Sequence, residues 1–334
     1  MQTDVLILGA GPAGCAAAIR ARHAGLQVTL IERLAQPKVA PGETLHPGIE
    51  PILVQLGVWN QILAEHFHRH RGIWVEWDGP RRFQPYGCDE QGEWLGLQVD
   101  RARFHMILQK AAMDLGAVLL RPLNPIAPLR QGDRIVGIRT SAGPIYVRWL
   151  IDATGRKHWL ANQLRLPPQI HSPSLHVRFG WTKSHDDTLR GQPLFSATPS
   201  GWEWQAPLGN SWTAWACLRA TGKQLHPQFS HEFSYGTDLS WRIFPTCASL
   251  GWFLLGDSAA LLDPSSSHGV LRALMSGVLA SRLIELVACG SLSERSAIEY
   301  YVSWINEQFR CDVSALRELY MRHRFGSKLW EQNG

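Results

Sequence analysis

A glycine-rich turn near the start of the chain constrains its fold more than any other feature. The segment GAGPAG at 9–14 follows the apolar run 5–8 and opens an alanine-rich stretch, 13–23, with helical character. A second apolar run, 28–31, ends in Glu32. A strand, a glycine turn, a helix and a strand that ends in an acidic residue form the dinucleotide-binding fingerprint. The pattern therefore predicts a Rossmann-like domain in this part of the chain.

The residues of this turn have separate physical tasks. Gly9 allows the tight turn, Gly11 lets the backbone approach a pyrophosphate, and Gly14 lets the helix pack closely on the strand. Free N–H groups at the helix start attract phosphate, and Glu32 can accept hydrogen bonds from a ribose. The predicted cofactor contacts in this segment are Gly9, Gly11, Ala13, Gly14, Glu32 and Arg33. The alternative is a glycine turn that binds no ligand.

Composition argues against several classes of protein. The 334 residues carry 33 Lys+Arg and 28 Asp+Glu, a formal charge of +5 that does not suggest a nucleic-acid binder. The six cysteines are scattered without a C-x-x-C pair, so we expect no disulfide framework, no zinc site and a reducing compartment. No apolar run reaches membrane-spanning length. We therefore expect a cytoplasmic protein without a transmembrane segment or a bound metal.

The hydrophobic pattern beyond the fingerprint predicts two α/β stretches around a β-rich insert. Helices are expected at 48–64, 101–115, 269–287 and 293–323, and strands at 72–77, 94–99, 117–120, 134–140 and 145–151. Between 172 and 243, strand-like segments rich in Trp are broken by Gly, Pro and Ser.

We therefore predict an α/β fold: a Rossmann-like domain with an inserted, β-sheet-rich substrate domain and a C-terminal helical segment. The expected ranges are 1–74, 98–166 and 246–290 for the discontinuous nucleotide-binding domain, 75–97 and 167–245 for the substrate domain, and 291–334 for the C-terminal helices. No second G-x-G-x-x-G occurs, so we expect no separate NAD(P)H domain.

Two further segments each end an apolar run with a turn of small residues. They are IDATGR at 151–156 and LGDSA at 255–259. In this order after the fingerprint, they resemble FAD-binding oxidoreductases of the p-hydroxybenzoate-hydroxylase-like superfamily, over most of 1–165 and 245–290. The resemblance implies that FAD is the cofactor and that Asp257 binds its ribityl chain. It also implies that Arg101, Asp152, Gly155 and Gly256 lie near FAD.

The segment DPSSSHGV at 263–270 precedes the expected helix 269–287. A helix N-terminus aimed at the pyrimidine edge of the isoalloxazine would stabilise negative charge on the reduced flavin. Pro264, Gly269 and Val270 are therefore predicted to contact FAD, and Gly269 would let the backbone lie close to the ring. An ordinary proline-bearing helix start is the alternative.

Narrower features resemble the tryptophan-halogenase-like flavoproteins. PGETL at 41–45 with Pro47 is similar to the family's loop after the second strand, which implies that Glu43 and Thr44 contact FAD. WEWQAP at 202–207 is close to the family's W-x-W-x-I-P, and 264–269 has the spacing of its P-x-x-S-T-G turn, with His268 replacing threonine. The C-terminal residues Tyr320, Arg324, Phe325, Leu329 and Trp330 are similar to its last helix.

One departure from this family changes the predicted chemistry. Halogenases use a lysine two residues before a Gly-Ile pair to handle the hypohalous species. Here the pair is Gly72-Ile73 and the position holds His70, and no lysine lies between Lys38 and Lys110. Halogenation is therefore not expected. The pattern is most similar to the short flavoproteins that mature tryptophylquinone cofactors in lysine and glycine oxidases and in amine dehydrogenase, whose relatives hydroxylate a Trp of a partner polypeptide.

His268, His70 and Trp204 are the predicted catalytic residues. An imidazole titrates near neutrality and can act as an acid or a base. Trp202 and Trp204 share one strand face and could form a wall between flavin and substrate. Surface or structural histidines and core tryptophans are the alternatives. A metal site at His66, His68 and His70 is not favoured, because no third type of ligand lies nearby.

The predicted function is an FAD-dependent monooxygenase that hydroxylates an indole through a flavin C4a-hydroperoxide. The preferred substrate is a peptidyl Trp of a precursor protein or peptide, during tryptophylquinone biogenesis. The other partners are O2 and, as the electron source, NAD(P)H or a separate flavin reductase. Two alternatives stay open. One is a small-molecule enzyme, such as a halogenase relative or an isoprenoid reductase, and the other is a non-catalytic flavoprotein assembly factor.

Overall fold

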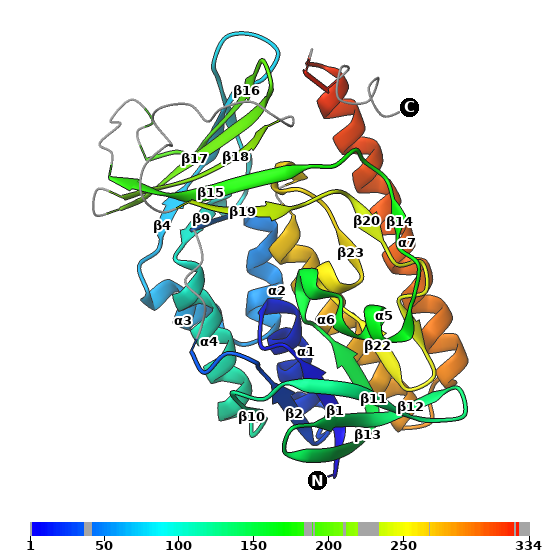
Figure 1. The fold of residues 1–334 in the computed structure, drawn as a ribbon. Helices are drawn as coiled ribbons and strands as arrows, with labels where there is room; N and C mark the ends of the chain where they lie inside the picture. The colour runs from blue at the N-terminus through cyan, green and yellow to red at the C-terminus, as the bar shows by residue number, and fades with distance from the viewer. Residues whose placement is uncertain are drawn as a thin grey trace.

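The computed structural model describes residues 2–36, 42–183, 189, 191–209, 212–219, 234–266, 268–323 and 325–326 (Figure 1). The predicted Pro41, Arg324, Leu329 and Trp330 lie outside these ranges. A core sheet with its helices forms one end of the molecule and a second sheet the other, and the long helix α7 (Glu294–Met321) runs beside both. The predicted class, α/β with an inserted sheet-rich part and a C-terminal helix, is confirmed.

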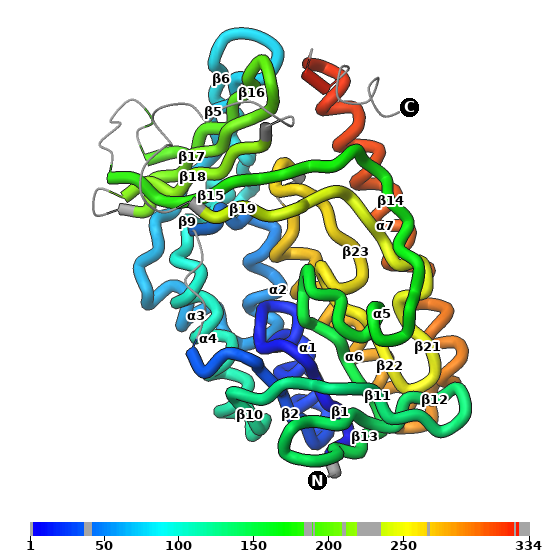
Figure 2. Tube along the Cα trace, viewed as in Figure 1, coloured from blue at the N-terminus to red at the C-terminus, as the bar shows by residue number. Residues whose placement is uncertain are grey.

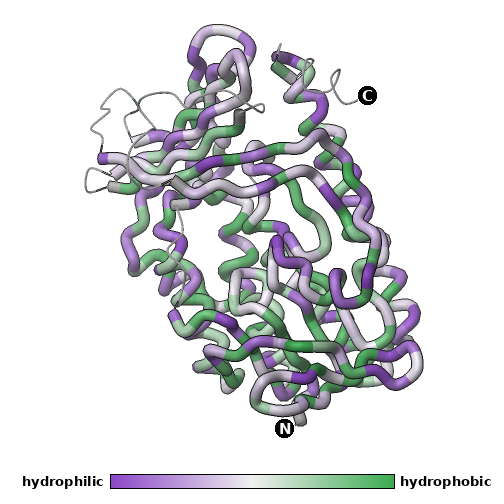
Figure 3. The backbone as a smooth tube through the Cα atoms, in the orientation of Figure 1, coloured by the Kyte–Doolittle hydropathy of each residue, from purple (hydrophilic) through white to green (hydrophobic). Residues whose placement is uncertain are grey.

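The core sheet forms around the first apolar run. Strand β1 (Gln2–Leu8) lies between β2 (Val28–Ile31) and β13 (Gly143–Asp152), in parallel with both. The side chains of residues 5–8 are buried, as expected for the centre of a parallel sheet. Figure 3, which colours the backbone by hydropathy, shows hydrophobic segments where this sheet and its helices lie. The remaining strands of this eight-stranded sheet are β10 (Val118–Leu120), β11 (Pro125–Gln131), β12 (Arg134–Thr140), β21 (Ala248–Ser249) and β22 (Trp252–Leu254).

Helix packing on this sheet depends on small residues. Helix α1 (Pro12–His23) is alanine-rich and almost entirely buried, and α6 (Gly269–Ala288) crosses it closely. A Cβ on Gly277 of α6 would lie 2.4 Å from the carbonyl oxygen of Ala13. Helix α4 (Arg101–Asp114) also packs on α1. These three helices match the ranges expected from the sequence.

The single helix expected at 48–64 is instead divided. The structure has a short 3-10 turn, η1 (Pro47–Ile49), then α2 (Glu50–Gln55) and α3 (Trp59–Ala64). The break lies at Gly57, whose φ of +72° is left-handed and ends the first helix. The periodic apolar residues continue across the break, which is why the sequence pattern suggested one helix.

The second sheet is assembled from two separate parts of the chain. Its seven strands, in spatial order, are β19 (Ser234–Asp238), β15 (His176–Lys183), β18 (Trp212–Arg219), β17 (Gly201–Gly209), β16 (Leu194–Thr198), β5 (Gly72–Glu76) and β6 (Arg82–Pro85). Figure 2 shows β5 and β6 beside β16, although more than a hundred residues separate them. The domain boundary expected at residue 74 thus falls inside β5.

Smaller elements connect the two ends. A three-stranded sheet contains β3 (Glu43–Leu45), β9 (Gly96–Val99) and β4 (His68–His70). The others are β7 (Cys88–Asp89), β8 (Gly92–Glu93), β14 (Gln169–Ile170), β20 (Arg242–Ile243), β23 (Ala260–Leu261), η2 (Gly155–Lys157), α5 (Trp159–Leu164), η5 (Gly256–Ser258) and η6 (Pro264–Ser266). Within the described ranges, no helix is both long and apolar enough to cross a membrane.

A buried hydrogen-bond network ties the second sheet to α7 and to the turn before α6. The indole N–H of Trp202 donates to the Tyr320 hydroxyl (2.8 Å), which donates to Asp263 Oδ2 (3.0 Å). The indole of Trp241 and the backbone N–H of Ser265 donate to the same carboxylate. Asp263 is 1% exposed, and burial raises its pKa while these donors lower it. The network fixes the position of the turn that leads into α6.

Replacing Tyr320 by Phe tests this network. The variant leaves the buried Trp202 N–H without an acceptor and removes one donor to Asp263, which should lower the free energy of unfolding by about 1–3 kcal/mol. Urea unfolding measures the change. The control is Tyr300→Phe, since Tyr300 is 58% exposed. Equal stability of both variants would show that the network does not stabilise the fold.

Candidate active site

The glycine turn after β1 contains two glycines required by packing and one that faces open space. Gly9 has a φ of +100°, and a Cβ there would lie 2.4 Å from the carbonyl oxygen of Ala153. A Cβ on Gly14 would lie 2.0 Å from the Gly9 oxygen. A Cβ on Gly11, the residue before α1, would meet nothing within 4 Å. Gly11 thus leaves room for a ligand against the exposed N–H groups of the helix start.

Glu32 follows β2 and faces the same turn. One carboxylate oxygen accepts from the backbone N–H of Ala10 (3.2 Å) and the other from that of Leu34 (3.0 Å). Each oxygen retains a lone pair for a ribose hydroxyl. The neighbouring Arg33 is exposed. Sequence analysis missed Gln109 of α4. Its buried side-chain amide donates to the Ala10 carbonyl (2.9 Å) and thereby helps to hold the glycine turn in place.

The carboxylate of Asp152 accepts hydrogen bonds from three protein groups, and its predicted contact with the cofactor stays a prediction. It is fully buried, and Oδ1 accepts from the N–H of Thr154 (2.8 Å) and the hydroxyl of Ser258 (3.2 Å). Its Oδ2 accepts from the N–H of Leu160 (2.6 Å). The carboxylate therefore holds the turns at 153–155 and 256–258 together. Gly155, at a φ of +63°, borders open space beyond them.

Four charged side chains from four segments lie close together beside these turns: Glu43, Arg101, Arg156 and Asp257. Glu43 of β3 pairs with Arg101 of α4 at 3.1 Å. Burial raises the pKa of Glu43, Arg101 lowers it, and the carboxylate of Asp257 raises it. Burial likewise raises the pKa of Asp257, and Arg101 and Arg156 lower it. The Nε of Arg101 is buried without a hydrogen-bond partner in the described ranges. The structure thus brings Glu43, Arg101 and Asp257 together, whereas Thr44 bonds to Gln98. The contact of these four residues with the cofactor stays a prediction.

The start of α6 is open on its outer side. Pro264 and Gly269 are exposed, Val270 is buried beneath them, and a Cβ on Gly269 would meet nothing within 4 Å. His268 precedes the helix and makes no side-chain cap. The helix has 20 residues, so its free N–H groups carry the positive end of a substantial dipole.

A row of rings continues from His268. The ring of His268 lies 5.9 Å from that of His46, His46 lies 5.1 Å from Tyr86, and Tyr86 lies 5.4 Å from His70, between ring centroids. Sequence analysis found His70 and His268 but neither His46 nor Tyr86. His46 and His70 come together because β9 pairs with both β3 and β4, and Tyr86 follows β6, which pairs with β5. No local motif signals this arrangement.

His70 is buried and neutral. It is 1% exposed, its Nδ1 donates to the Gly72 carbonyl (3.0 Å), and its Nε2 has no hydrogen-bond partner in the described ranges. Burial lowers its pKa to about 4, against the Gly72 hydrogen bond, which raises it. Trp204, the third predicted catalytic residue, is half-buried on β17 opposite Phe195 and outside this row. Among the described residues, no group of His, Cys, Asp or Glu is arranged to hold a metal ion.

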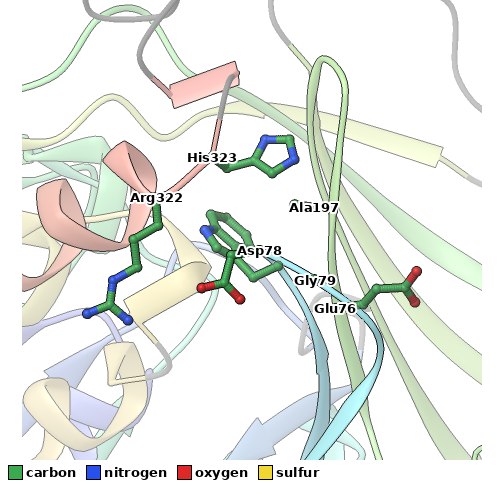
Figure 4. A pocket seen from close by; sticks show the side chains of 7 residues that line it. Glu76, Asp78, Gly79, Ala197, Arg322 and His323 are labelled. Atoms are coloured by element: carbon green, nitrogen blue, oxygen red, sulfur yellow. The ribbon is translucent and has the colours of Figure 1, made fainter.

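A separate pocket of about 410 Å³ opens at the far end of the second sheet (Figure 4). Arg322 and His323 approach it from the end of α7, and Glu76, Asp78 and Ala197 from the sheet. Trp77 forms its inner wall, with its ring 6.0 Å from that of the buried Tyr320. The residues lining it include none of those predicted to contact the cofactor.

Comparison with known proteins identifies the ligand of the glycine turn. Residues 2–133 match the family model of the FAD binding domain. The chain is 30% identical over 327 residues to menaquinone reductase of Mycobacterium tuberculosis, across 85% of this chain and 77% of the reductase. It is 28% identical over 348 residues to tryptophan 2-halogenase of Chondromyces crocatus, across 90% of this chain and 64% of the halogenase. The chain belongs to the FAD-binding flavoprotein family of these enzymes.

Solved structures share the fold of this flavoprotein. The myxobacterial chondrochloren halogenase superposes with a TM-score of 0.88 at 22% identity, covering 98% of this chain and 85% of the halogenase. A peptidyl tryptophan dihydroxylase essential for tryptophylquinone cofactor biogenesis superposes with a TM-score of 0.76 at 20% identity, covering 97% and 76%.

The residues present fit FAD. The space beside Gly11 suits a pyrophosphate, Glu32 offers acceptors to a ribose, and the free Nε of Arg101 offers a donor beside Asp257. The exposed start of α6 suits the electron-rich edge of a flavin. The cofactor of this flavoprotein is therefore FAD.

The Gly11→Ala variant tests whether FAD occupies the open space beside Gly11. A methyl group there contacts no protein atom, so the FAD-free protein should unfold at the wild-type urea concentration. It would occupy the space of the pyrophosphate, so FAD affinity should fall by about tenfold or more, which is about 1.4 kcal/mol. Fluorescence titration of the FAD-free protein with FAD measures the affinity. Gly79→Ala, at another open glycine outside the groove, is the control. Unchanged affinity in Gly11→Ala would contradict this binding mode.

The neutral His70 predicts a dependence of stability on pH. The unfolded chain protonates this histidine near the ordinary pKa of 6.5, whereas in the folded protein the pKa is lowered to about 4. The free energy of unfolding should therefore decrease as the pH falls from 6.5 toward 4, with His70 contributing about 3 kcal/mol.

The His70→Gln variant should flatten this dependence. Urea unfolding of the FAD-loaded flavoprotein at several pH values measures the slope. The exposed His23→Gln serves as the control. Identical slopes for wild type and His70→Gln would mean that folding does not lower the pKa of His70.

Proposed function

We propose that this flavoprotein is an FAD-dependent monooxygenase that hydroxylates an indole. The observation that carries the proposal is the buried, neutral His70 in the position where the halogenase-like pattern has lysine. An ammonium group can bind a hypohalous species, and a neutral imidazole carries no such charge. The resemblance to flavoproteins that add oxygen to Trp supports hydroxylation instead.

The protein's own residues would prepare the site for this chemistry. FAD supplies the activation of oxygen when it is bound and reduced. Glu43, Arg101 and Asp257 hold the cofactor, and the start of α6 stabilises negative charge on its ring. The rings of His46, Tyr86 and His268 would line the adjoining space and limit access of water.

The proposed substrate is a Trp within a partner polypeptide. The support is the fold shared with the peptidyl tryptophan dihydroxylase along 97% of this chain. Electrons would come from NAD(P)H or from a separate flavin reductase, since the chain holds a single dinucleotide fingerprint. The place of the reaction would be tryptophylquinone biogenesis in the cytoplasm.

Reduction of an isoprenoid double bond is the second candidate. It is supported by the 30% identity to menaquinone reductase over 85% of this chain. Such a reaction consumes reduced flavin without oxygen, so the two candidates differ in a property that is simple to measure.

Intact-mass analysis of a co-expressed precursor polypeptide of a tryptophylquinone enzyme tests the proposal. In air, the precursor should gain oxygen on a single Trp, and the gain should be smaller with the Gly11→Ala variant when FAD is limiting. Free tryptophan and menaquinone are incubated in parallel with the FAD-loaded protein and NAD(P)H. An unmodified precursor together with anaerobic saturation of menaquinone would replace the proposed function by the reductase.

A further inference from the structure

His46 lies where two cofactor-facing segments meet. It follows β3, which begins with Glu43 of the charged cluster, and its ring lies beside His268 at the start of α6. His70, at the far end of the row, is sealed from solvent, whereas His46 is only half-buried. His46 is therefore the imidazole between these two segments that a ligand can reach.

The tautomer of His46 is fixed by the backbone. The side chain caps the turn η1, because its Nδ1 accepts from the N–H of Gly48 at 3.0 Å. Nδ1 therefore carries no proton, and the neutral ring must carry its proton on Nε2. Protonation of Nδ1 would place two N–H groups against each other and lose this hydrogen bond.

The surroundings of His46 also disfavour a charged ring. Burial lowers its pKa from 6.5, and the neighbouring His268 lowers it further. His268 is itself held neutral by burial and by Arg272, which lower its pKa. Tyr86 contacts the other side of the His46 ring, and burial raises the pKa of its hydroxyl, so it contributes no negative charge.

We propose that His46 is a hydrogen-bond donor of the active site, in which a neutral imidazole held by Gly48 presents its Nε2–H to an oxygen atom of the ligand. The ligand is an oxygen-bearing molecule placed between β3 and the start of α6. A neutral N–H donor of fixed orientation stabilises charge that develops on an oxygen without reorganising during the reaction. Tyr86 and His268 position the ring from its two sides.

This inference rests on the proposed function only in taking the start of α6 as the flavin-facing element. Nitrogen NMR of the FAD-loaded protein, labelled in histidine, tests the tautomer without any substrate. At pH 7, His46 should show a protonated Nε2 and an unprotonated Nδ1. In His268→Asn the removal of the neighbouring imidazole should move the titration of His46 to higher pH. A charged ring or a proton on Nδ1 would overturn the proposal even if hydroxylation is confirmed.

Two substitutions test the donor. His46→Asn keeps an acceptor oxygen near Gly48 and lacks the Nε2–H, so kcat should fall by about 100–1,000-fold with little change in FAD affinity. His46→Gln carries an amide N–H at the reach of Nε2 and should recover most of this loss. His23→Gln is the control. Wild-type kcat in His46→Asn would overturn the donor role, and failure of every variant and wild type to act on the substrate would count against the proposed function alone.

Discussion

The close approach of three backbone segments at the start of α1 is the constraint on which the rest of this structure depends. Side-chain atoms on Gly9, Gly14 or Gly277 would collide with the carbonyl oxygens of Ala153, Gly9 and Ala13. Because these positions carry hydrogen instead, the end of β1, the turn after β13 and helix α6 converge within van der Waals contact. That convergence places the turn held by Asp152 and the segment that carries Asp257 near the free N–H groups at the start of α1, beside the open space at Gly11.

Charged and neutral side chains lie in different parts of the site, an arrangement that suits a flavin. The charged residues Glu43, Arg101 and Asp257 lie together: Arg101 lowers the pKa of both carboxyl groups, and Asp257 raises that of Glu43. Along the row of rings that begins at the start of α6, burial instead lowers the pKa of His46, His70 and His268 and so favours their neutral forms. We propose that the neutral rings interact with a reacting oxygen and that Glu43, Arg101 and Asp257 hold the cofactor.

The local parts of this account could be predicted from the sequence. The fingerprint at 9–14 and the helices of α4, α6 and α7 follow from turn chemistry and periodicity, which involve neighbouring residues alone. His46, Tyr86 and Gln109 could not be found in this way, because their positions depend on strand pairs and helix contacts between distant segments. Asp152 shows a different limit: its motif was recognised, but only the hydrogen bonds of the fold reveal that its carboxylate holds two turns together. Gly57 divided an expected helix for a similar reason, since apolar periodicity does not register a left-handed residue.

The central claim is that the site activates oxygen for transfer to an indole. The most direct measurement is a single turnover of the reduced, FAD-loaded protein with a Trp-containing precursor under isotopically labelled oxygen gas. The account predicts that the hydroxyl oxygen on the Trp carries the label. A product whose oxygen comes from water, or reoxidation of the flavin by menaquinone with no labelled product, would contradict it.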